Sequence, residues 1–429
     1  MVKSLRGRWE MGAYRPRVVD GQIDAALATF GAVLVTGPKW CGKTTTARRH
    51  ASSELLVADP AGDFSARSLA ELDPALALEG DSPRLVDEWQ EVPKLFDAAR
   101  FICDERGGSG HFLFTGSATP RDDAAPMHSG TGRFARVAMQ TMTLFESGAA
   151  AGGVSLAALM DGEEPSGQAG GLSVTDIAEL VTRGGWPGSL DMGLTSAAAV
   201  PMQYIQTVAE TDMPSLEGSR RDPTRTLALI ASLGRNESTL ASDRTIAADL
   251  AGSLSRPTVL SRLSSLRRLN VVRDVPAWHP ALRSPIRLRQ AVKRHLADPS
   301  LAVAALGADP SALLGDVKTL GLLFESLALR DLGVFAEAMG GSLGHYSDYV
   351  GREADAVVSL ADGRWGLFEV KLGHGQVDAA AGALCEIERV MVAAGERPPS
   401  VKCVLIGFGL PAHLRPDGVC VVPIDVLEP

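Results

Sequence analysis

A glycine-rich stretch near the N-terminus constrains the fold more than any other part of this sequence. Four strand-forming residues are followed by a loop with a glycine at each end and then by a run that can be helical: Val33-Leu34-Val35-Thr36-Gly37-Pro38-Lys39-Trp40-Cys41-Gly42-Lys43-Thr44. This is the phosphate-binding pattern G-x-x-x-x-G-K-S/T between a strand and a helix. Glycine lets the backbone bend and bring amide groups close to a phosphate, and the first turn of the helix adds the positive end of its dipole. The sequence therefore predicts a nucleotide site.

Two adjacent acids supply the expected partners of this loop. In the loop, Lys43 would reach the β- and γ-phosphates, and the Thr44 hydroxyl would ligate Mg²⁺. Asp87 and Glu88 follow a short apolar strand, Arg84-Leu85-Val86. Asp87 would hold the Mg²⁺ shell together with Thr44, and Glu88 would orient or deprotonate the attacking water.

A second strand end is expected beside the γ-phosphate. The run His111-Phe112-Leu113-Phe114 is apolar and ends in Thr115-Gly116-Ser117. Ligands bind at the carboxyl ends of strands in a parallel sheet, so Ser117 or Thr115 would sense the phosphate there. A plain turn at the end of the strand is the alternative. The complete set of expected nucleotide-binding residues is Gly37, Pro38, Lys39, Cys41, Gly42, Lys43, Thr44, Thr45, Asp87 and Ser117.

Arg133 is the candidate for an arginine that neutralises charge on the γ-phosphate. It lies in Gly132-Arg133-Phe134-Ala135-Arg136, a basic pair before another strand-like run. Such an arginine acts in cis or from a neighbouring subunit, and the second case requires self-association. A surface ion pair is the alternative explanation of this residue.

These stretches resemble the AAA-like P-loop ATPases of bacteria and archaea whose C-terminal half is a domain of unknown function. The resemblance rests on Tyr14-Arg15-Pro16-Arg17, the loop 37–44, Val86-Asp87-Glu88-Trp89-Gln90-Glu91-Val92-Pro93, Phe114-Thr115-Gly116-Ser117, Gly132-Arg133 and Leu144-Phe145-Glu146. It implies ATP binding, with Mg²⁺, and slow hydrolysis. It does not imply a biological substrate.

A basic segment in the middle of the chain has a helix-turn-helix pattern. Residues 220–294 contain 15 Lys and Arg but 5 Asp and Glu, in a chain whose formal net charge is −9. Ser255 and Pro257 suit the start of a helix that follows a short helix and a glycine turn, and a wing strand would begin at Asn270. The expected groove-facing residues are Arg256, Thr258 and Arg262. DNA binding and a purely internal packing role both fit this pattern.

A carboxylate–carboxylate–lysine pattern lies in the C-terminal part. Asp355 is on a strand, Asp362-Gly363 forms a tight turn, and Glu369 and Lys371 share one face of the returning strand. This resembles the PD-(D/E)xK nuclease core. The resemblance implies Mg²⁺ held by Asp355, Glu369 and the Val370 carbonyl, a fourth group from Glu325, and a water activated by Lys371. The alternative is an edge hairpin with an exposed Glu–Lys pair.

The whole chain is expected to be a cytoplasmic, multidomain α/β protein. No apolar run approaches the roughly 18 residues of a membrane span, the basic N-terminus lacks an apolar stretch, and the five cysteines show no metal-ligand spacing. The predicted parts are an arm over 1–28, a P-loop domain with a parallel sheet over 29–147, a helical connector over 148–219 whose part 148–171 is an insertion or mobile segment, a winged helix-turn-helix domain over 220–295, and a restriction-endonuclease-like α/β domain over 296–429.

Two functional hypotheses follow. The first is a Mg²⁺-dependent ATPase that associates with DNA through the winged helix and the nuclease-like domain and regulates cleavage with ATP. The second is an ATP-dependent switch or scaffold whose nuclease-like domain is not catalytic and binds protein partners. Metal-dependent cleavage separates them, because only the first needs Asp355, Glu369 and Lys371 together.

Overall fold

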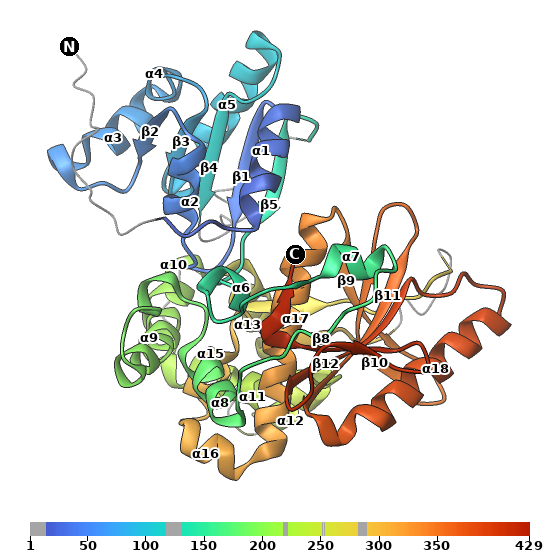
Figure 1. Cartoon of the computed structure of the whole chain (residues 1–429). Helices are drawn as coiled ribbons and strands as arrows, with labels where there is room; N and C mark the ends of the chain where they lie inside the picture. Colours follow the sequence, from blue (N-terminus) through green and yellow to red (C-terminus); the bar gives the residue numbers. More distant parts are fainter. Residues whose placement is uncertain (1–13, 117–130, 218–221, 251, 253, 282–289) are drawn as a thin grey trace.

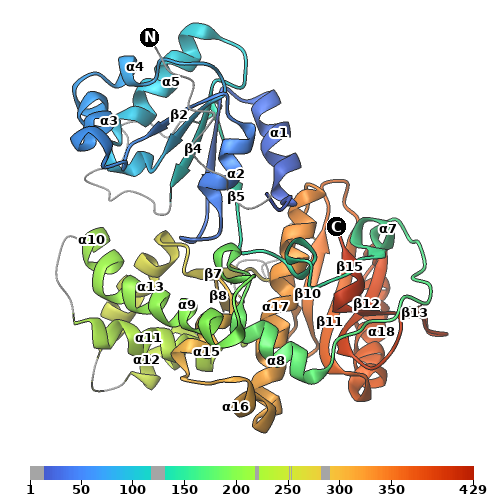
Figure 2. The same cartoon turned by 60° about the vertical axis from the view of Figure 1, so that its left-hand side comes forward.

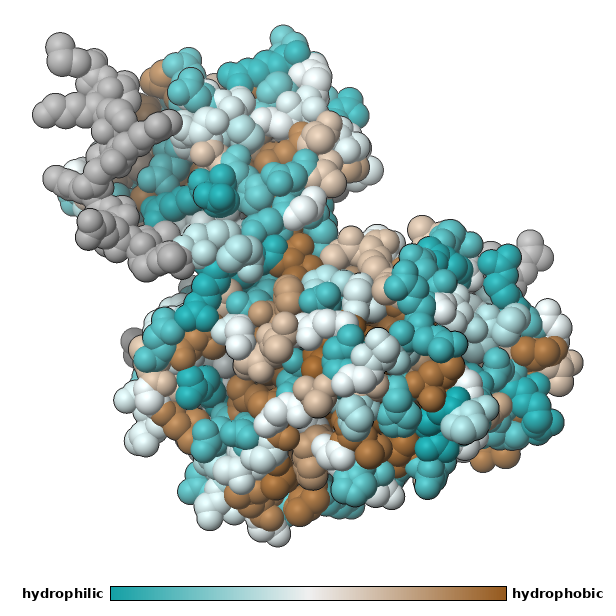
Figure 3. All heavy atoms as spheres, viewed as in Figure 1, coloured by the Kyte–Doolittle hydropathy of each residue, from teal (hydrophilic) through white to brown (hydrophobic). Residues whose placement is uncertain are grey.

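The chain forms a smaller N-terminal lobe above a larger lobe. The computed structural model describes residues 14–116, 131–217, 222–250, 252, 254–281 and 290–429. Figure 1 shows the first sheet in the N-terminal lobe, and the large lobe as a group of helices beside a second sheet. Figure 2, turned by 60°, shows the same separation, and the space-filling view in Figure 3 shows the two lobes meeting over a narrow waist.

The N-terminal lobe is built on a five-stranded parallel sheet of order β2-β3-β4-β1-β5. Its strands read as continuous apolar runs because helices cover both faces. One face packs Leu34 and Phe114 against α3 to α5, and the other packs Val33 against α1 and α2. The elements are α1 (Val19–Thr29), β1 (Ala32–Thr36), α2 (Lys43–His50), β2 (Ser53–Leu56), α3 (Ala61–Leu72), α4 (Pro74–Ala77), β3 (Arg84–Asp87), η1 (Trp89–Glu91), α5 (Lys94–Arg106), β4 (Phe112–Gly116) and β5 (Phe134–Ala138).

The segment between β5 and α17 forms the helical side of the large lobe, except for β6 and α7, which lie against the C-terminal part (Figure 1). Three helices, α11 to α13, are followed by a two-stranded antiparallel sheet of β7 and β8, in which Val275 pairs with Lys293. The elements are α6 (Leu144–Ser147), β6 (Val154–Ser155), α7 (Leu156–Met160), α8 (Val174–Arg183), η2 (Pro187–Ser189), α9 (Leu194–Thr207), the π-helical turn η3 (Val208–Asp212), α10 (Met213–Glu217), α11 (Pro223–Arg235), α12 (Asp243–Asp249), α13 (Arg256–Arg268), β7 (Val272–Val275), β8 (Lys293–Leu296), α15 (Pro299–Ala305) and α16 (Pro310–Gly315).

The other side of the large lobe is a six-stranded mixed sheet of order β13-β14-β12-β11-β10-β9. Strands β9 to β11 are antiparallel, and β11, β12 and β14 are parallel. Helix α17 covers the face that carries Phe368, and α18 covers the face that carries Leu367. The elements are α17 (Val317–Ala338), β9 (Ser342–Ser347), β10 (Glu353–Ser359), β11 (Trp365–Gly373), η4 (His374–Gln376), α18 (Val377–Ala393), β12 (Val401–Phe408), β13 (His413–Leu414), β14 (Cys420–Pro423), η5 (Ile424–Val426) and β15 (Leu427–Glu428).

Three predicted boundaries differ from the structure. Within the expected arm, α1 packs on the first sheet, so the segment from Val19 belongs to the N-terminal lobe. Part of the expected mobile segment 148–171 is instead packed, because β6 pairs with β15 and Leu156, Leu159 and Met160 of α7 are buried. The expected boundary at residue 296 cuts through one core, because Leu301 and Val303 of α15 are buried in the same cluster as the helices before it.

Among the helices of the described residues, none has the length and apolar character needed to cross a membrane.

Candidate functional site

The phosphate loop follows β1, and its glycines occupy positions that a larger residue would strain. Gly42 has φ +103°, in the left-handed region that disfavours a Cβ atom. A Cβ on Gly37 would lie 2.1 Å from the carbonyl oxygen of Met139. The loop thus packs closely against the segment that follows β5. The requirement for glycine comes from this packing as well as from phosphate chemistry.

The loop, β3 and β4 bring the side chains of Thr44, Asp87 and Thr115 together, next to Lys43. Lys43 Nζ donates to the carbonyl oxygens of Gly37 at 2.9 Å and Pro38 at 2.7 Å. Thr44 Oγ1 donates to Asp87 Oδ1 at 2.8 Å, and Thr115 Oγ1 donates to the same oxygen at 2.5 Å. The strand order causes this convergence, because β4 lies between β1 and β3.

The pair of Thr44 and Asp87 fits a magnesium ion. Mg²⁺ takes oxygen ligands, keeps several waters and needs only one or two groups from the protein in phosphate sites. Thr44 Oγ1 and Asp87 Oδ1 are the atoms that would hold it, and the bound ion would neutralise charge on phosphate oxygens. Lys43 must leave the two carbonyl oxygens to reach a phosphate.

Glu88 lies on a strained turn directly after Asp87. Its φ of +55° falls in the left-handed region, which costs free energy for any residue with a Cβ and tends to persist at functional sites. The carboxylate accepts a hydrogen bond from Gln90 Nε2. The next residue, Trp89, packs its ring against Phe96 and holds the turn in place.

Arg133 is far from the phosphate loop of its own chain. It precedes β5, and its carbonyl oxygen accepts from the Ala32 N–H at the start of β1, at 3.1 Å. The loop follows the other end of β1, and the two strands are parallel, so Arg133 lies at the opposite end of the strands from the phosphate loop of its own chain, which argues against the alternative that it acts in cis. Arg133 Nε instead donates to Asp104 Oδ1 at 2.5 Å. Action on a neighbouring subunit stays a prediction, and Ser117 lies outside the described residues.

The large lobe contacts the phosphate loop directly. Lys39 Nζ lies 2.7 Å from Asp212 Oδ1, and the Asp212 side chain is 7% exposed. Asn270 Nδ2 donates to the carbonyl oxygen of Gly37 at 3.4 Å. Asp212 is the last residue of η3, and Asn270 lies between α13 and β7. Two elements of the helical side therefore touch the loop that would hold phosphate.

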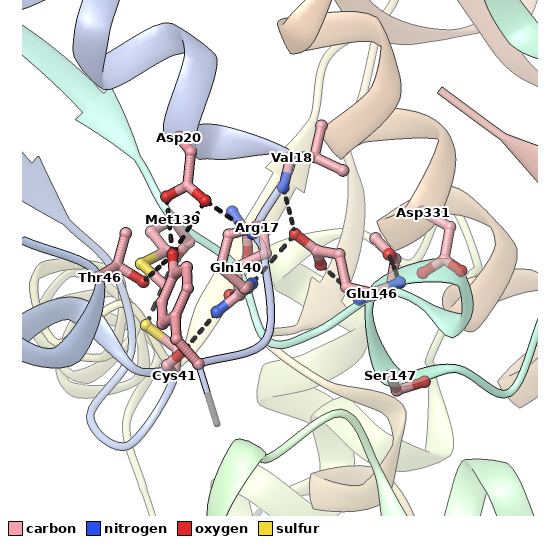
Figure 4. A network of polar contacts seen from close by, with 12 residues as sticks. Arg17, Val18, Asp20, Cys41, Thr46, Met139, Gln140, Glu146, Ser147 and Asp331 are labelled. Atoms are coloured by element: carbon pink, nitrogen blue, oxygen red, sulfur yellow. Dashed lines mark hydrogen bonds and ion pairs between the residues drawn. The ribbon is translucent and has the colours of Figure 1, made fainter. Parts of the chain in front are cut away.

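Arg17 joins the phosphate loop to α6, as Figure 4 shows. Its Nη1 donates to the carbonyl oxygen of Cys41 at 2.8 Å, Nη2 to that of Gln140 at 2.8 Å, and Nε to Glu146 Oε1 at 3.0 Å. The side chains of Arg17 and Glu146 are 4% and 2% exposed. A guanidinium with fixed donors can satisfy three acceptors at once, which a buried charge requires.

The polar contacts continue from Glu146 to α17 (Figure 4). Glu146 completes a capping box with Thr143 at the start of α6, and the Leu144 N–H donates to Asp331 Oδ2 at 2.9 Å. Asp331 follows Arg330, which lies 3.0 Å from Asp298. A chain of buried hydrogen bonds thus runs from the phosphate loop to the helix that also carries Glu325.

His50 ties the end of α2 to α1. Its Nδ1 lies 2.7 Å from Asp24 Oδ1 and its Nε2 lies 3.1 Å from Asp20 Oδ1, with the imidazole 6% exposed. The hydrogen bond to Asp20 raises the pKa of His50, against the effect of burial. Tyr14 donates to the same Asp20 oxygen at 2.7 Å, so the carboxylate holds α2 and the preceding segment together.

The second predicted cluster also forms. Asp355 and Glu369 are level on neighbouring strands, since the Asp355 N–H donates to Glu369 Oε2 at 3.3 Å. Lys371 Nζ lies 2.7 Å from Glu369 Oε1 and 3.6 Å from Asp355 Oδ2. Glu325 on α17 joins through a residue that the sequence did not single out, Lys293, whose Nζ lies 2.7 Å from Glu325 Oε1 and 3.1 Å from Asp355 Oδ1.

The carboxylates and ammonium groups of this cluster shift one another's pKa values. Burial and the nearby charge of Asp355 raise the pKa of Glu325 to about 8 and that of Glu369 to about 7. Lys293 and Lys371 hold the pKa of Asp355 below its usual value despite its burial. Among the described residues, no group of three or more His, Cys, Asp and Glu side chains is arranged to hold a metal ion.

The predicted DNA-facing residues divide between surface and core. Arg256 is exposed and Thr258 is half-buried near the start of α13. Arg262 is 3% exposed and donates to Thr226 Oγ1 at 2.5 Å, so its assignment to a groove-facing position is wrong. The cause is its place on the side of α13 that packs on α11. Several other basic residues of this segment form internal ion pairs: Arg235 with Asp249, Arg267 with Asp274, and Arg294 with Asp243.

Four residues at these sites escaped sequence reasoning in different ways. Arg17 was part of a stretch that carried the family resemblance, but nothing local indicated its contact with the phosphate loop. Asp212 lies in a π-helical turn and Lys293 at the start of β8, and neither belongs to a motif. Asn270 was expected only as the start of a wing strand. The roles of all three depend on contacts between distant parts of the chain. The basic excess around Lys293 was the one available signal, and it suggested a different partner.

Comparison with known proteins agrees with the geometry of the first site. A family model described as an AAA domain matches residues 29–147. The matched residues include the phosphate loop, Asp87, Glu88 and all five strands of the N-terminal sheet. ATP binding and hydrolysis are therefore supported at the level of that family. A second model, a domain of unknown function (DUF8612), matches residues 174–312 and so includes α15 with the helices before it.

Two relatives align over most of the chain. It is 28% identical over 359 residues to an uncharacterized protein of Mycobacterium bovis, and equally to one of Mycobacterium tuberculosis, with 83% of this chain and 73% of each relative covered. Among solved structures, a Walker-type ATPase of Pyrococcus abyssi aligns with a TM-score of 0.41 and 14% identity, covering 68% of this chain and 96% of that one.

The raised pKa of His50 predicts how the stability of the ATPase domain depends on pH. Its contribution is fully present below the unfolded-state pKa near about 6.5 and is lost as the pH rises through the higher folded-state pKa. We expect the thermal unfolding midpoint to fall over that window by an amount equivalent to about 1 kcal/mol, a modest value for a hydrogen bond to a charged group. His50→Gln should flatten this dependence, and an unchanged pH profile in that variant would contradict the assignment.

Proposed function

We propose that this protein is a Mg²⁺-dependent ATPase that works as a nucleotide switch, in which the state of the phosphate loop sets the contacts of the large lobe. The observation that carries the proposal is the ion pair between Lys39 in the loop and the buried Asp212 of η3, at 2.7 Å. A bound nucleotide changes a conformational equilibrium only if it interacts differently with the two states. This ion pair supplies such a difference.

The phosphates of ATP would compete with Asp212 for Lys39. Both groups are anionic, and the loop brings its lysines close to wherever the phosphates lie. Weakening the ion pair would leave the Asp212 carboxylate buried without its cation, which favours movement of η3 away from that position. By thermodynamic linkage, the same contact would lower the affinity of the resting protein for ATP.

Arg17 offers a second route in the same direction. Its guanidinium donates to the Cys41 carbonyl oxygen inside the loop and to Glu146 at the start of α6. Reorientation of the loop backbone around phosphate would therefore act on α6 and, through the Leu144–Asp331 hydrogen bond, on α17. In this proposal Arg17 is a positioning residue and does not touch the nucleotide.

The proposed chemistry uses residues of the N-terminal lobe alone. Lys43 would bind the β- and γ-phosphates, Thr44 and Asp87 would hold Mg²⁺, and Glu88 would orient or deprotonate the attacking water. Thr115, hydrogen-bonded to Asp87, would report the presence of the γ-phosphate to the end of β4. An arginine delivered from another subunit, Arg133, would complete the site only in an assembly.

The first prediction separates nucleotide binding from hydrolysis. Lys43→Ala should weaken ATP binding by about 50-fold, because it removes charge-assisted hydrogen bonds to phosphate worth about 2–3 kcal/mol. Glu88→Gln should retain ATP affinity and reduce turnover by about 10²–10⁴-fold, the usual contribution of a general base. Equilibrium binding of a fluorescent ATP analogue and steady-state phosphate release measure the two effects. Normal turnover in the Glu88→Gln protein would remove Glu88 from its role.

The second prediction tests coupling between the lobes. Asp212→Asn should raise ATP affinity about five-fold, the lower end of measured coupling between sites, because Lys39 is no longer held. With ATP bound to the Glu88→Gln protein, hydrogen exchange in η3 should increase, and the increase should be absent in the Lys43→Ala protein. Asp191→Asn is the matched control, because it removes an ion pair with Arg15 at a side chain that is 86% exposed. Equal effects of the two aspartate substitutions would overturn the switch.

DNA association is the second candidate function. Three helices followed by the β7–β8 pair have the layout of a winged helix. A groove at the start of α13 is lined by Ser255, Thr258, Ser261, Arg262 and the ion pair of Arg225 with Asp222, among others. Arg256 is exposed beside it. Against this, the internal ion pairs of the module leave fewer cations for phosphates than its composition suggests. We therefore propose weak, non-specific DNA contact as an output of the switch.

Salt dependence tests that contact. If about six phosphates are neutralised, the logarithm of the DNA affinity should fall with the logarithm of salt concentration with a slope near −5. Arg256→Ala should reduce the size of the slope by about 1. Arg235→Ala, a 61% exposed arginine paired with Asp249 on the same module, is the control. A slope near zero would favour a packing module or a protein partner.

The C-terminal sheet supports a nuclease-like fold in this proposal. The order α17, β9, β10, β11, α18, β12, with β9 to β11 antiparallel and β12 parallel to β11, is similar to the core of the PD-(D/E)xK nucleases. The contacts among Asp355, Glu369 and Lys371 support this part of the proposal. Cleavage is not part of the proposed function, because of the position of Lys293.

A further inference from the structure

We infer that the ammonium group of Lys293 takes the place of the divalent cation in the nuclease-like cluster, so that the cluster is a closed ion-pair junction and binds no metal. The two carboxylates assigned to the metal from sequence, Asp355 and Glu325, are bridged by one lysine nitrogen, at 3.1 and 2.7 Å. A divalent ion would need the same oxygens at about 2.0–2.1 Å, and its charge would repel the ammonium.

The other oxygens of Asp355 and Glu369 are also engaged. Asp355 Oδ2 accepts from the Val370 N–H at 2.9 Å and lies 3.6 Å from Lys371 Nζ. Glu369 accepts from Lys371 through Oε1 and from the Asp355 N–H through Oε2. A metal ion would have to displace donors at each of these oxygens. With two ammonium groups against three carboxyl groups, the cluster already carries most of the positive charge that an ion would supply.

Access to the cluster is restricted as well. The side chains of Lys293, Glu325, Asp355 and Glu369 are 7, 11, 13 and 13% exposed, and only Lys371, at 24%, is more open. A phosphodiester must approach its metal closely to be cleaved. The low exposure of these side chains leaves little surface for such an approach.

The lysine is held in place by the strand that carries it. Lys293 begins β8 and pairs with Val275 of β7. Just before it, the Ala291 carbonyl oxygen accepts from His345 Nε2 on β9 at 3.0 Å. On the other side, the His345 backbone exchanges hydrogen bonds with Pro276 and Trp278 at 2.9 and 2.7 Å. The β7–β8 pair is thus attached to the edge of the C-terminal sheet by these hydrogen bonds. Lys293 adds ion pairs with Glu325 and Asp355 to this attachment.

The inference gives the cluster a mechanical role. It joins β8 of the helical module to α17, β10 and β11 of the C-terminal sheet through buried charges. Loss of one partner would leave an unpaired buried carboxylate, which is strongly unfavourable. The same charges that would build a nuclease site therefore fix the two parts of the large lobe to each other.

Manganese binding to the full-length protein, without nucleotide, tests the inference. Free Mn²⁺ is measured by electron paramagnetic resonance during titration, and thermal unfolding is followed with and without Mn²⁺. The wild-type protein and Asp355→Asn should bind Mn²⁺ identically, and Mn²⁺ should shift the unfolding midpoints of the two proteins by the same amount. Lys293→Met should unfold at a lower temperature than the wild type in the absence of Mn²⁺. It should bind one additional Mn²⁺ per chain, with an affinity at least about ten-fold higher than that of any Mn²⁺ binding by the wild type at this cluster. Mn²⁺ should raise the unfolding midpoint of this variant.

Two controls make the outcome decisive. The double variant Lys293→Met/Asp355→Asn should lose the additional Mn²⁺, which assigns it to this cluster. Asp87→Asn reports any Mn²⁺ held at the phosphate loop, so a failure of the ATPase proposal does not affect the result. An Mn²⁺ site in the wild type that disappears in Asp355→Asn would overturn the inference, and this comparison holds even if Lys293→Met does not fold. A folded Lys293→Met protein without additional Mn²⁺ would also overturn it.

Discussion

The buried pair of Arg17 and Glu146 is the interaction on which the arrangement of the two lobes depends. Both side chains are almost fully removed from solvent, and neither charge is tolerable there without the other. The Arg17 guanidinium also donates to the Cys41 carbonyl oxygen of the phosphate loop, and the Glu146 carboxylate is part of the capping box at the start of α6. The pair therefore fixes the loop, the segment before α1 and the start of the large lobe in one geometry.

Helix α17 carries the consequences of that arrangement across the large lobe. Arg330 and Asp331 receive the contacts that begin at the phosphate loop, and Glu325 belongs to the cluster with Lys293. The two groups are separated along the helix by about 9 Å. Because protein interiors are closely packed, a shift of α17 at Arg330 and Asp331 would also displace Glu325. Nucleotide chemistry in one lobe and the junction between β8 and the C-terminal sheet thus share one rigid element.

Many charged side chains of this protein form internal ion pairs, which its composition alone does not indicate. The basic excess of residues 220–294 suggests a polyanion, yet Lys293, Arg267 and Arg294 pair with carboxylates of the same chain. Arg262 is buried against α11. Among the described residues, the exposed arginines near the start of α13, such as Arg256, suit a weak contact better than tight recognition. The C-terminal cluster follows the same principle, since it balances carboxylates with lysines from two different strands.

The sequence by itself determined the elements whose signal is local. Gly37, Gly42, Lys43 and Thr44 specify a strand, a tight loop and a helix start, because phosphate binding needs backbone bends that only this spacing allows. The hairpin register that brings Asp355 level with Glu369 follows from a period of two and a tight turn. Several features follow only from the tertiary packing: the position of Arg133 at the opposite end of the strands from the phosphate loop, the burial of Arg262, the packing of residues 154–160, and the contacts of Asp212 and Lys293. Each of these features depends on which distant segments of the chain pack together. The pattern of apolar residues along one strand or helix predicts which side is buried, but it does not predict which other segment covers that side.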